Sequence, residues 1–221
     1  MSPQLRFPDA RTAADVLTFA SRAARLGDGA IRLRAAGGTL ALSAAPVAPR
    51  GMGDDLPTVL AMRFVPIDPE LVCDLVVDAG ALGAGDGAGA VALPDGAVSA
   101  AWAGISPPRG GWEPAGSCTA SALEEVARVG MAEVARAVPT DAGEEIVRTV
   151  RGQVWGRPAP ELDGVIAGAA FAAVGLGFVA GEETAAVSRM GTWTRVSLRR
   201  GHVLVRAGNP TGLTAIRRTG G

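Results

Sequence analysis

Apolar and polar residues alternate along residues 31–42, with the period of two expected for a β-strand that buries one face. The alternation breaks once, at Gly37-Gly38, a pair that makes a two-residue turn. The pattern therefore predicts an antiparallel hairpin with one apolar face, in which Ala35 lies opposite Leu40.

A second alternating segment covers residues 193–206 and centres on Arg200-Gly201. If these two residues form the turn, Val196 lies opposite Val205 on an apolar face. The other face then carries ionisable pairs: Arg195 opposite Arg206, and Arg199 opposite His202. Because like charges directly across two strands destabilise the pair, we expect an anion near this hairpin.

Between the hairpins the period changes to that of helices, with two shorter strand-like runs at residues 58–65 and 71–77. Capping boxes, prolines and glycines mark the helix ends. Four helices are predicted: one from the capping box Thr12–Asp15 to near Gly27, one from the capping box Ser121–Glu124 to Pro139, one from Asp141 to Pro158, and one from Val165 to about Phe178.

Together these elements predict an α+β fold of two packed halves, each with a helix followed by an antiparallel β-hairpin. The C-terminal half contains helical structure equivalent to three extra helices. The predicted parts are an N-terminal domain (1–98), a connecting segment rich in Trp, Pro and Gly (99–116), a C-terminal helical domain that ends in the hairpin (117–208), and a flexible tail (209–221).

The uncharged stretch from Gly164 to Gly181 is rich in Ala and Gly, which gain little from lipid, so we interpret it as a buried helix and expect no membrane association. The first twenty residues lack the continuous apolar run of a secretory signal. Cys73 and Cys118 show no paired spacing, which favours a reducing, cytoplasmic location.

Composition excludes several chemistries. The chain has no Lys and no Tyr, so it offers no Schiff-base lysine, no P-loop lysine and no phenolic acid. A single histidine, His202, cannot build a multi-histidine metal site, and no carboxylates have the spacing of a calcium loop. We therefore expect no metal and no cofactor, and we interpret His202 as a surface histidine rather than a member of a catalytic triad.

The segment between Trp102 and Trp112, the tryptophan segment, is the first candidate binding site. Pro107-Pro108 would fix an extended backbone, Arg109 could meet an acidic or phosphate group, and the two indoles could line a surface for a peptide, a base or a partner protein. The alternative is a strap between domains whose tryptophans plug the core.

The arginine face of the C-terminal hairpin is the second candidate, with Arg195, Arg199, His202 and Arg206. Helices followed by a hairpin with arginine at its tip also describe a winged-helix module, whose wing contacts nucleic-acid phosphates. Arginines outnumber acids in residues 151–221, but acids outnumber arginines in residues 1–150, and the pI is about 5.9. Carboxylates of the N-terminal part could therefore neutralise the hairpin.

Three fragments resemble a family of two-part proteins from actinobacteria to which no activity is attached. They are the tryptophan segment, the stretch around Phe171 to Phe178, and residues 200–206. The resemblance implies a two-part arrangement but no catalytic residue. Residues 10–82, where a helix precedes a hairpin and further strands, are similar at the level of fold to a sliding-clamp repeat, although no clamp motif accompanies the similarity.

These observations predict a non-enzymatic binding or scaffold protein that acts through contacts with a protein partner or through self-association. A nucleic-acid-binding protein that uses the C-terminal hairpin is the second interpretation. A small-molecule enzyme without metal is the third, since nothing in the sequence excludes it.

Overall fold

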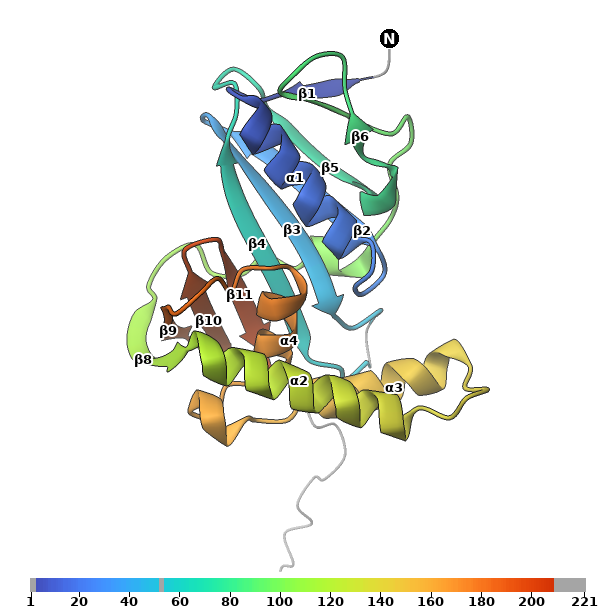
Figure 1. The fold of residues 1–221 in the computed structure, drawn as a ribbon, viewed down its shortest axis with the longest axis vertical. Helices are drawn as coiled ribbons and strands as arrows, with labels where there is room; N and C mark the ends of the chain where they lie inside the picture. Colours follow the sequence, from blue (N-terminus) through green and yellow to red (C-terminus); the bar gives the residue numbers. More distant parts are fainter. Residues whose placement is uncertain (1–2, 52–53, 209–221) are drawn as a thin grey trace, which may run out of the picture.

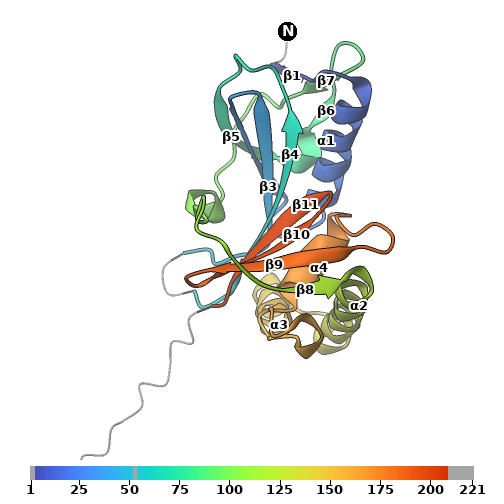
Figure 2. The same ribbon diagram turned by 90° about the vertical axis from the view of Figure 1, so that its left-hand side faces the viewer.

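The computed structural model describes residues 3–51 and 54–208, so the predicted tail at 209–221 lies outside the described residues. An eight-stranded antiparallel sheet forms one layer, and the α-helices cover one of its faces (Figures 1 and 2). The strand order is β5-β2-β3-β4-β11-β10-β9-β8. The bounds of these strands are β2 Ala30–Ala36, β3 Thr39–Val47, β4 Thr58–Pro66, β5 Cys73–Asp78, β8 Glu113–Thr119, β9 Thr184–Met190, β10 Trp193–Leu198 and β11 Gly201–Arg206.

The sheet has an N-terminal and a C-terminal half, which meet where β4 pairs with β11. Each half contains a helix and an antiparallel hairpin, so the mixed α+β fold of two similar, packed halves is confirmed. The helices are α1 (Ala10–Ala23), α2 (Ala120–Ala137), α3 (Glu144–Trp155) and α4 (Gly168–Gly175). Three single-turn 3-10 helices, η1 (Ala79–Ala81), η2 (Ala101–Gly104) and η3 (Pro160–Leu162), lie in the connections.

The alternation in the first hairpin gives the observed register. Ala35 pairs with Leu40 and Leu33 pairs with Leu42, and all four side chains are buried. The side of the sheet that faces the helices is therefore apolar, and the arginines of β2 lie on the opposite side. We call that opposite side the outer face.

The predicted register of the second hairpin is wrong: each residue of one strand pairs two positions away from the expected residue of the other. The turn is Arg199-Arg200, not Arg200-Gly201, so Arg195 lies opposite Leu204 and His202 lies opposite Ser197. Because this shift moves each residue by two positions along its partner strand, every side chain keeps its predicted face. Val196 and Val203 are buried under the helices as expected, but the predicted arginine pair across the strands does not form.

The helix starts differ from the predicted capping boxes. In α1 the cap is Asp9, whose carboxylate accepts a hydrogen bond from the Thr12 amide. In α2 the cap is Thr119, whose hydroxyl accepts from the Ala122 amide. A capping side chain must precede the helix and reach its first free N–H groups, and several Ser, Thr or Asp residues near each start could do so.

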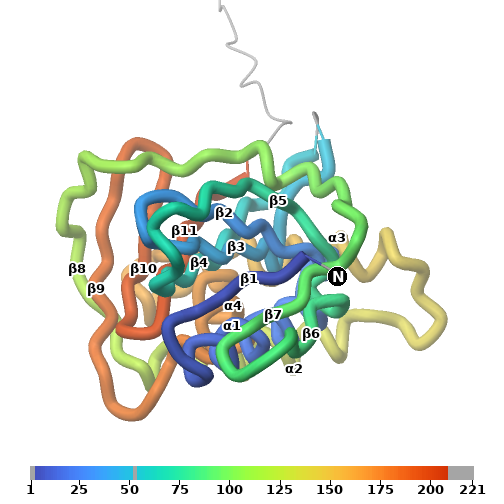
Figure 3. Tube along the Cα trace, turned by 90° about the horizontal axis from the view of Figure 1, so that it is seen from above, coloured from blue at the N-terminus to red at the C-terminus, as the bar shows by residue number. Residues whose placement is uncertain are grey.

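Residues 4–6 and residues 83–92 form a second, three-stranded sheet in the order β1-β7-β6, which the sequence pattern did not indicate. Its strands are β1 (Gln4–Arg6), β6 (Gly83–Ala84) and β7 (Ala90–Ala92). Figure 3 shows this sheet beside α1. Leu5 in β1, Val91 in β7 and Phe7 next to β1 join the main core, so this sheet extends the core alongside α1.

The main core lies between the helices and the large sheet. Its largest fully buried side chain is Trp155, which stacks on Phe171 with a centroid distance of 4.4 Å. In the described ranges, no helix is long and apolar enough to cross a membrane. The predicted helix between Gly164 and Gly181 is shorter than expected, and six of the eight residues of α4 are buried.

Candidate binding groove

A row of side chains crosses the outer face of the sheet and forms the floor of a groove. Residues on neighbouring strands that pair directly point to the same face, so the register defines this row. Its members are Arg32, Ser43, Met62 and His202, which lie on β2, β3, β4 and β11. Ser197 on β10 pairs with His202 and continues the row beyond the groove. The floor therefore combines residues from both halves of the chain.

The tryptophan segment crosses this outer face, as the chain between β7 and β8 does in Figure 2. The amide of Val98 donates to the carbonyl of Val76 in β5 at 2.8 Å, which fixes the start of the crossing. Trp102 is 4% exposed, and its indole Nε1 donates to Asp28 Oδ2 at 2.9 Å. Trp112 is half-buried, and its Nε1 donates to the Pro108 carbonyl at 3.2 Å.

Between the segment and the sheet lies a small apolar cluster, separate from the main core, that contains Trp102, Leu60 and Leu204. Beside it opens a groove of about 360 Å³. Its lining residues are Arg32, Arg34, Ala41, Ser43, Leu60, Met62, Phe64, Trp102, Ala103, Ile105, Ser106, Pro107, Pro108, Arg109, Trp112, Arg195, His202 and Leu204. Sites of this volume accept a small ligand or a few side chains of a peptide.

The charges of the groove are all of one sign. Four arginines line it, and none of its described lining residues is an aspartate or glutamate. Arg32 is neutralised from outside the lining by Asp74, with two hydrogen bonds of 2.7 Å, and it also donates to the Ala103 carbonyl. This pairing lowers the pKa of Asp74 from its ordinary value.

Arg195 is held by an aromatic ring instead of by a carboxylate. Its guanidinium carbon lies 4.6 Å from the centroid of the Trp112 ring. Its Nε is closed off from solvent and has no hydrogen-bond partner among the described residues. A cation–π contact of this kind leaves the terminal N–H groups that do not face the ring available for further donation.

His202 lies on the groove floor next to this arginine. Its Nδ1 lies 3.0 Å from Ser197 Oγ, and its ring centroid lies 5.9 Å from that of Phe64. Burial, and then the positive charge of Arg195, lower the pKa of His202 from 6.5. The imidazole is therefore neutral at pH 7.

The structure brings together most of the residues singled out in the sequence. Seven line the groove: Trp102, Pro107, Pro108, Arg109, Trp112, Arg195 and His202. The other two do not. Arg199 interacts with Glu183 at 3.5 Å, and Arg206 lies over the ring of Trp193 at 5.2 Å.

Sequence reasoning treated the tryptophan segment and the hairpin as separate candidates and missed the floor that joins them. Met62 and Phe64 in β4 and Arg34 in β2 were not singled out. Their alternation with buried neighbours places them on the outer face, and that signal could have found them. The pairing of β4 with β11, which brings them to His202, leaves no mark in the sequence.

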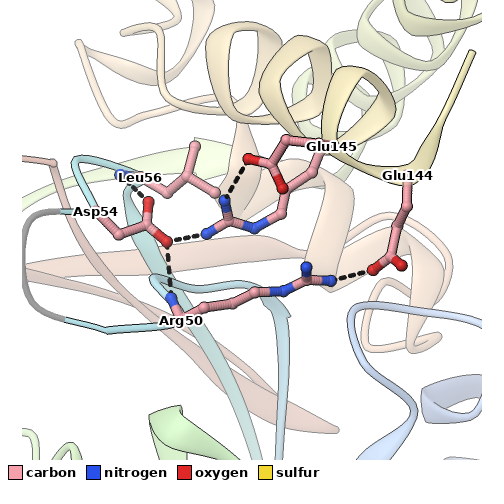
Figure 4. Close-up of polar contacts among 6 residues, drawn as sticks. Arg50, Asp54, Leu56, Glu144 and Glu145 are labelled. Atoms are coloured by element: carbon pink, nitrogen blue, oxygen red, sulfur yellow. Dashed lines mark hydrogen bonds and ion pairs between the residues drawn. The ribbon is translucent and has the colours of Figure 1, made fainter.

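A second cavity, of about 330 Å³, lies on the other side of Trp102, beside α3 and the chain between β3 and β4. Its charges are mostly neutralised within the protein, as Figure 4 shows. Arg50 pairs with Glu144, and Arg148 pairs with both Asp54 and Glu145. These ion pairs connect α3 to the N-terminal half, so the cavity is best described as a structural joint.

Other reactive groups are poorly placed for chemistry. Cys118 is buried, and burial, together with the nearby charge of Asp163, raises the pKa of its thiol, which opposes thiolate formation. Within residues 3–51 and 54–208, no group of three or more His, Cys, Asp or Glu side chains could hold a metal ion.

Two family models match the chain in succession. Residues 1–104 match a domain of unknown function, DUF8010, and residues 107–210 match another, DUF8185. These two domains together cover most of the chain, consistent with a two-part family. None of the curated proteins is significantly similar to it in sequence.

Solved structures of DNA polymerase sliding clamps have a similar fold. The clamp from Bartonella birtlesii, bound to griselimycin, is 10% identical with a TM-score of 0.50, over 96% of this chain and 66% of the clamp. The clamp from Caulobacter crescentus is 13% identical with a TM-score of 0.48, over 100% of this chain and 69% of the clamp. The chain therefore spans about two thirds of the length of these clamps, and the likeness concerns the fold alone.

Proposed function

We propose that this protein is a non-enzymatic scaffold that acts through protein contacts and receives a segment of a partner protein in the groove. The observation that carries the proposal is the outer face of the sheet between β2 and β10. Apolar side chains lie there beside half-buried Trp112, and Phe64 is 51% exposed. Aromatic and arginine side chains in a concave, largely apolar surface are the residues that most often supply binding energy at protein interfaces.

The fold agrees with this proposal. A DNA polymerase III subunit, the Bartonella clamp, has a similar fold. A protein of this fold can therefore work as one subunit among others. Self-association belongs to the same class of contact, and we keep it as an outcome of the experiment below.

An enzymatic role has less support. The pair of Ser197 and His202 is the nearest approach to a nucleophile and its base, but Ser197 does not line the groove. In serine hydrolases a carboxylate orients the histidine, whereas the charged neighbour of His202 is Arg195. We therefore assign the pair a structural role.

Nucleic-acid binding also has less support. A nucleic-acid surface needs a row of arginines free to meet phosphates. In the hairpin, Arg199 is paired with Glu183, and on α3 Arg148 is paired with two acids.

The remaining expectations of a cytoplasmic location and an actinobacterial origin rest on the sequence, and the free thiols of Cys73 and Cys118 agree with a reducing compartment.

The experiment is selection of a displayed library of random dodecapeptides on the immobilised protein, followed by affinity measurements on the enriched peptides. We expect Phe64→Ser to weaken them by about tenfold or more, since Phe64 lies in the groove. The matched control is Val72→Ser, because Val72 is 79% exposed and does not line the groove. Enriched peptides that ignore Phe64→Ser, or a library without enrichment, would contradict the proposed function.

A further inference from the structure

The distribution of charge along the groove is uneven. At the β2 end, Arg32 is neutralised by Asp74, and Arg34 lies 3.9 Å from the same carboxylate. At the β10 end, neither Arg195 nor Arg109 has an ion-pair partner among the described residues. The uncompensated positive charge is therefore concentrated next to Trp112.

The geometry of Arg195 suits one kind of group. The Trp112 ring covers one side of the Arg195 guanidinium, whose carbon lies 4.6 Å from the ring centroid, so a ligand meets the terminal N–H groups from the remaining sides. Two parallel N–H groups of a guanidinium match the two oxygens of a carboxylate, which a point charge such as ammonium does not. Among residues 3–51 and 54–208 no carboxylate forms an ion pair with Arg195, and its covered Nε has no hydrogen-bond partner there.

The middle of the groove suits a different group. Met62 and Phe64 lie on β4 between the two ends, and Ile105 of the tryptophan segment also lines the groove. A large apolar side chain placed there would cover Phe64 and leave the neighbouring position of the ligand close to Arg195. The order across the sheet, with β4 separated from β10 only by β11, fixes this relation.

Resting on the proposed function, we infer that the partner segment carries an aspartate or glutamate beside a large apolar residue, and that the acidic side chain binds Arg195 while the apolar one packs on Met62 and Phe64. A peptide is favoured over a single-stranded nucleic acid, since the centre of the floor, at Leu60, Met62 and Leu204, is aliphatic. Nucleic-acid grooves instead combine aromatic platforms with a row of cations along the backbone.

The test uses the full chain and the dodecapeptides selected above, each made as a fluorescent synthetic peptide and as an analogue with Asp→Asn or Glu→Gln at its acidic position. We expect the enriched sequences to share an acidic residue next to a large apolar one. The neutral analogue should bind about tenfold more weakly or worse, because a charge-assisted, two-point hydrogen bond is lost. The affinity of the acidic peptide should also fall as salt is added.

The variant Arg195→Met keeps an unbranched chain over Trp112 but removes the donors, and we expect it to bind the acidic peptide and its neutral analogue equally. Arg206→Met is the matched control, because Arg206 also lies over a tryptophan ring of the same hairpin and does not line the groove. It should leave both affinities unchanged. Thermal melts of the two variants show whether either has lost its fold, and Arg195→Lys, which keeps the charge but not the planar edge, should restore binding only in part.

The outcomes separate the two proposals. Peptides that depend on Phe64 but bind equally well as neutral analogues would leave the proposed function standing and overturn this inference. Peptides that depend on neither residue would overturn both. If the free protein sediments as a dimer that Phe64→Ser dissociates, the occupant of the groove is a second copy of the chain. If a labelled oligothymidylate displaces the peptide and needs Arg195 to do so, the occupant is a nucleic acid. Either result overturns the inference.

Discussion

The two tryptophans that begin and end the tryptophan segment have different roles. Trp102 is buried and bonded to Asp28, whereas Trp112 is half-buried and stacked with Arg195. The sequence suggested either a core plug or a binding surface for both residues. The structure places one indole in each kind of environment, and the segment joins them.

We therefore predict unequal stability effects at these two positions. Trp102→Ala should lower the free energy of unfolding by about 3–5 kcal/mol, because it opens a cavity beside the sheet and removes the indole N–H that donates to Asp28 Oδ2. Trp112→Ala should cost clearly less, since part of this ring already contacts solvent. Urea melts of both variants provide the measurement, and equal losses would contradict the assignment.

His202 should make the stability of the folded protein depend on pH. Its pKa in the folded protein lies below the ordinary value of 6.5. At a pH between the folded and the unfolded pKa, the unfolded chain therefore binds more protons than the folded one. Its contribution to stability is therefore complete above pH 6.5 and is lost as the pH falls through the folded pKa. Arg195 is the charged group that faces the ring, and Phe64 and Ser197 are its other neighbours.

Urea unfolding followed at several values from about pH 7.5 down to about pH 5 should show this loss in the wild type. His202→Gln should flatten the slope in that window. Asp74 does not confuse the result, because its pKa is lowered from 3.8 and its contribution is lost only at more acidic pH. A slope that is unchanged in His202→Gln would mean that another group titrates there.

At the scale of elements, alternation in the sequence predicted which face of each hairpin strand is buried, but it did not always predict the register. In the first hairpin Gly37-Gly38 marks the turn, and both φ angles are positive, as such a turn requires. In the second hairpin the glycine at 201 lies in the strand, where a Cβ would meet the ring of Phe178 at 2.6 Å. Glycine there permits close packing, so its presence was misleading as a turn signal.

Strands β8, β6 and β7 were missed for a related reason. Strand β8 contains Pro114 and a bulge at Gly116, and it pairs on only one side, so neither its composition nor its pattern resembles a buried strand. The small strands β6 and β7 are two and three residues long, too short to show a period. Their formation depends on packing against α1, which is not a local property of the sequence.

Close packing between helices leads to an element-scale prediction at Gly130 in α2. Replacing an interior helical glycine with alanine ordinarily favours the helix by about 1 kcal/mol. A Cβ at Gly130 would lie 2.2 Å from the ring of Trp155, which is itself stacked on Phe171 and cannot move aside easily. We therefore expect Gly130→Ala to destabilise the protein by about 1–3 kcal/mol.

Thermal melts check this expectation. Gly143→Ala is the control, because no atom other than those of its chain neighbours would lie within 4 Å of a Cβ there and its φ is −65°. It should shift the melting temperature much less than Gly130→Ala does. A Gly130→Ala variant at least as stable as the wild type would show that α2 and α3 can separate without cost.

At the scale of the whole molecule, the groove exists only because the two halves share one sheet. Arg32 and His202 lie in the same row across the outer face although most of the chain separates them in sequence. The residues of the tryptophan segment could be singled out because they are aromatic and because Pro107-Pro108 restricts the backbone, whereas the floor of the groove depends on the β4–β11 pairing. This is why the sequence predicted separate candidate sites and the structure contains one groove with residues of both.

The shared sheet also predicts how the molecule unfolds. Val203 in β11 is fully buried and pairs with Ala61 in β4, so a change there weakens the joint between the halves. Val203→Ala should cost about 1–3 kcal/mol and should lower the protection of amides in β2 and β3 as much as in β10 and α4, because neither half keeps its core once the joint opens. Hydrogen exchange measures this, with Val72→Ala as a control, since Val72 is largely exposed and outside the joint. If β2 and β3 kept wild-type protection while β10 and α4 lost theirs, the halves would be independent folding units, and the groove floor would open along the line between Met62 and His202.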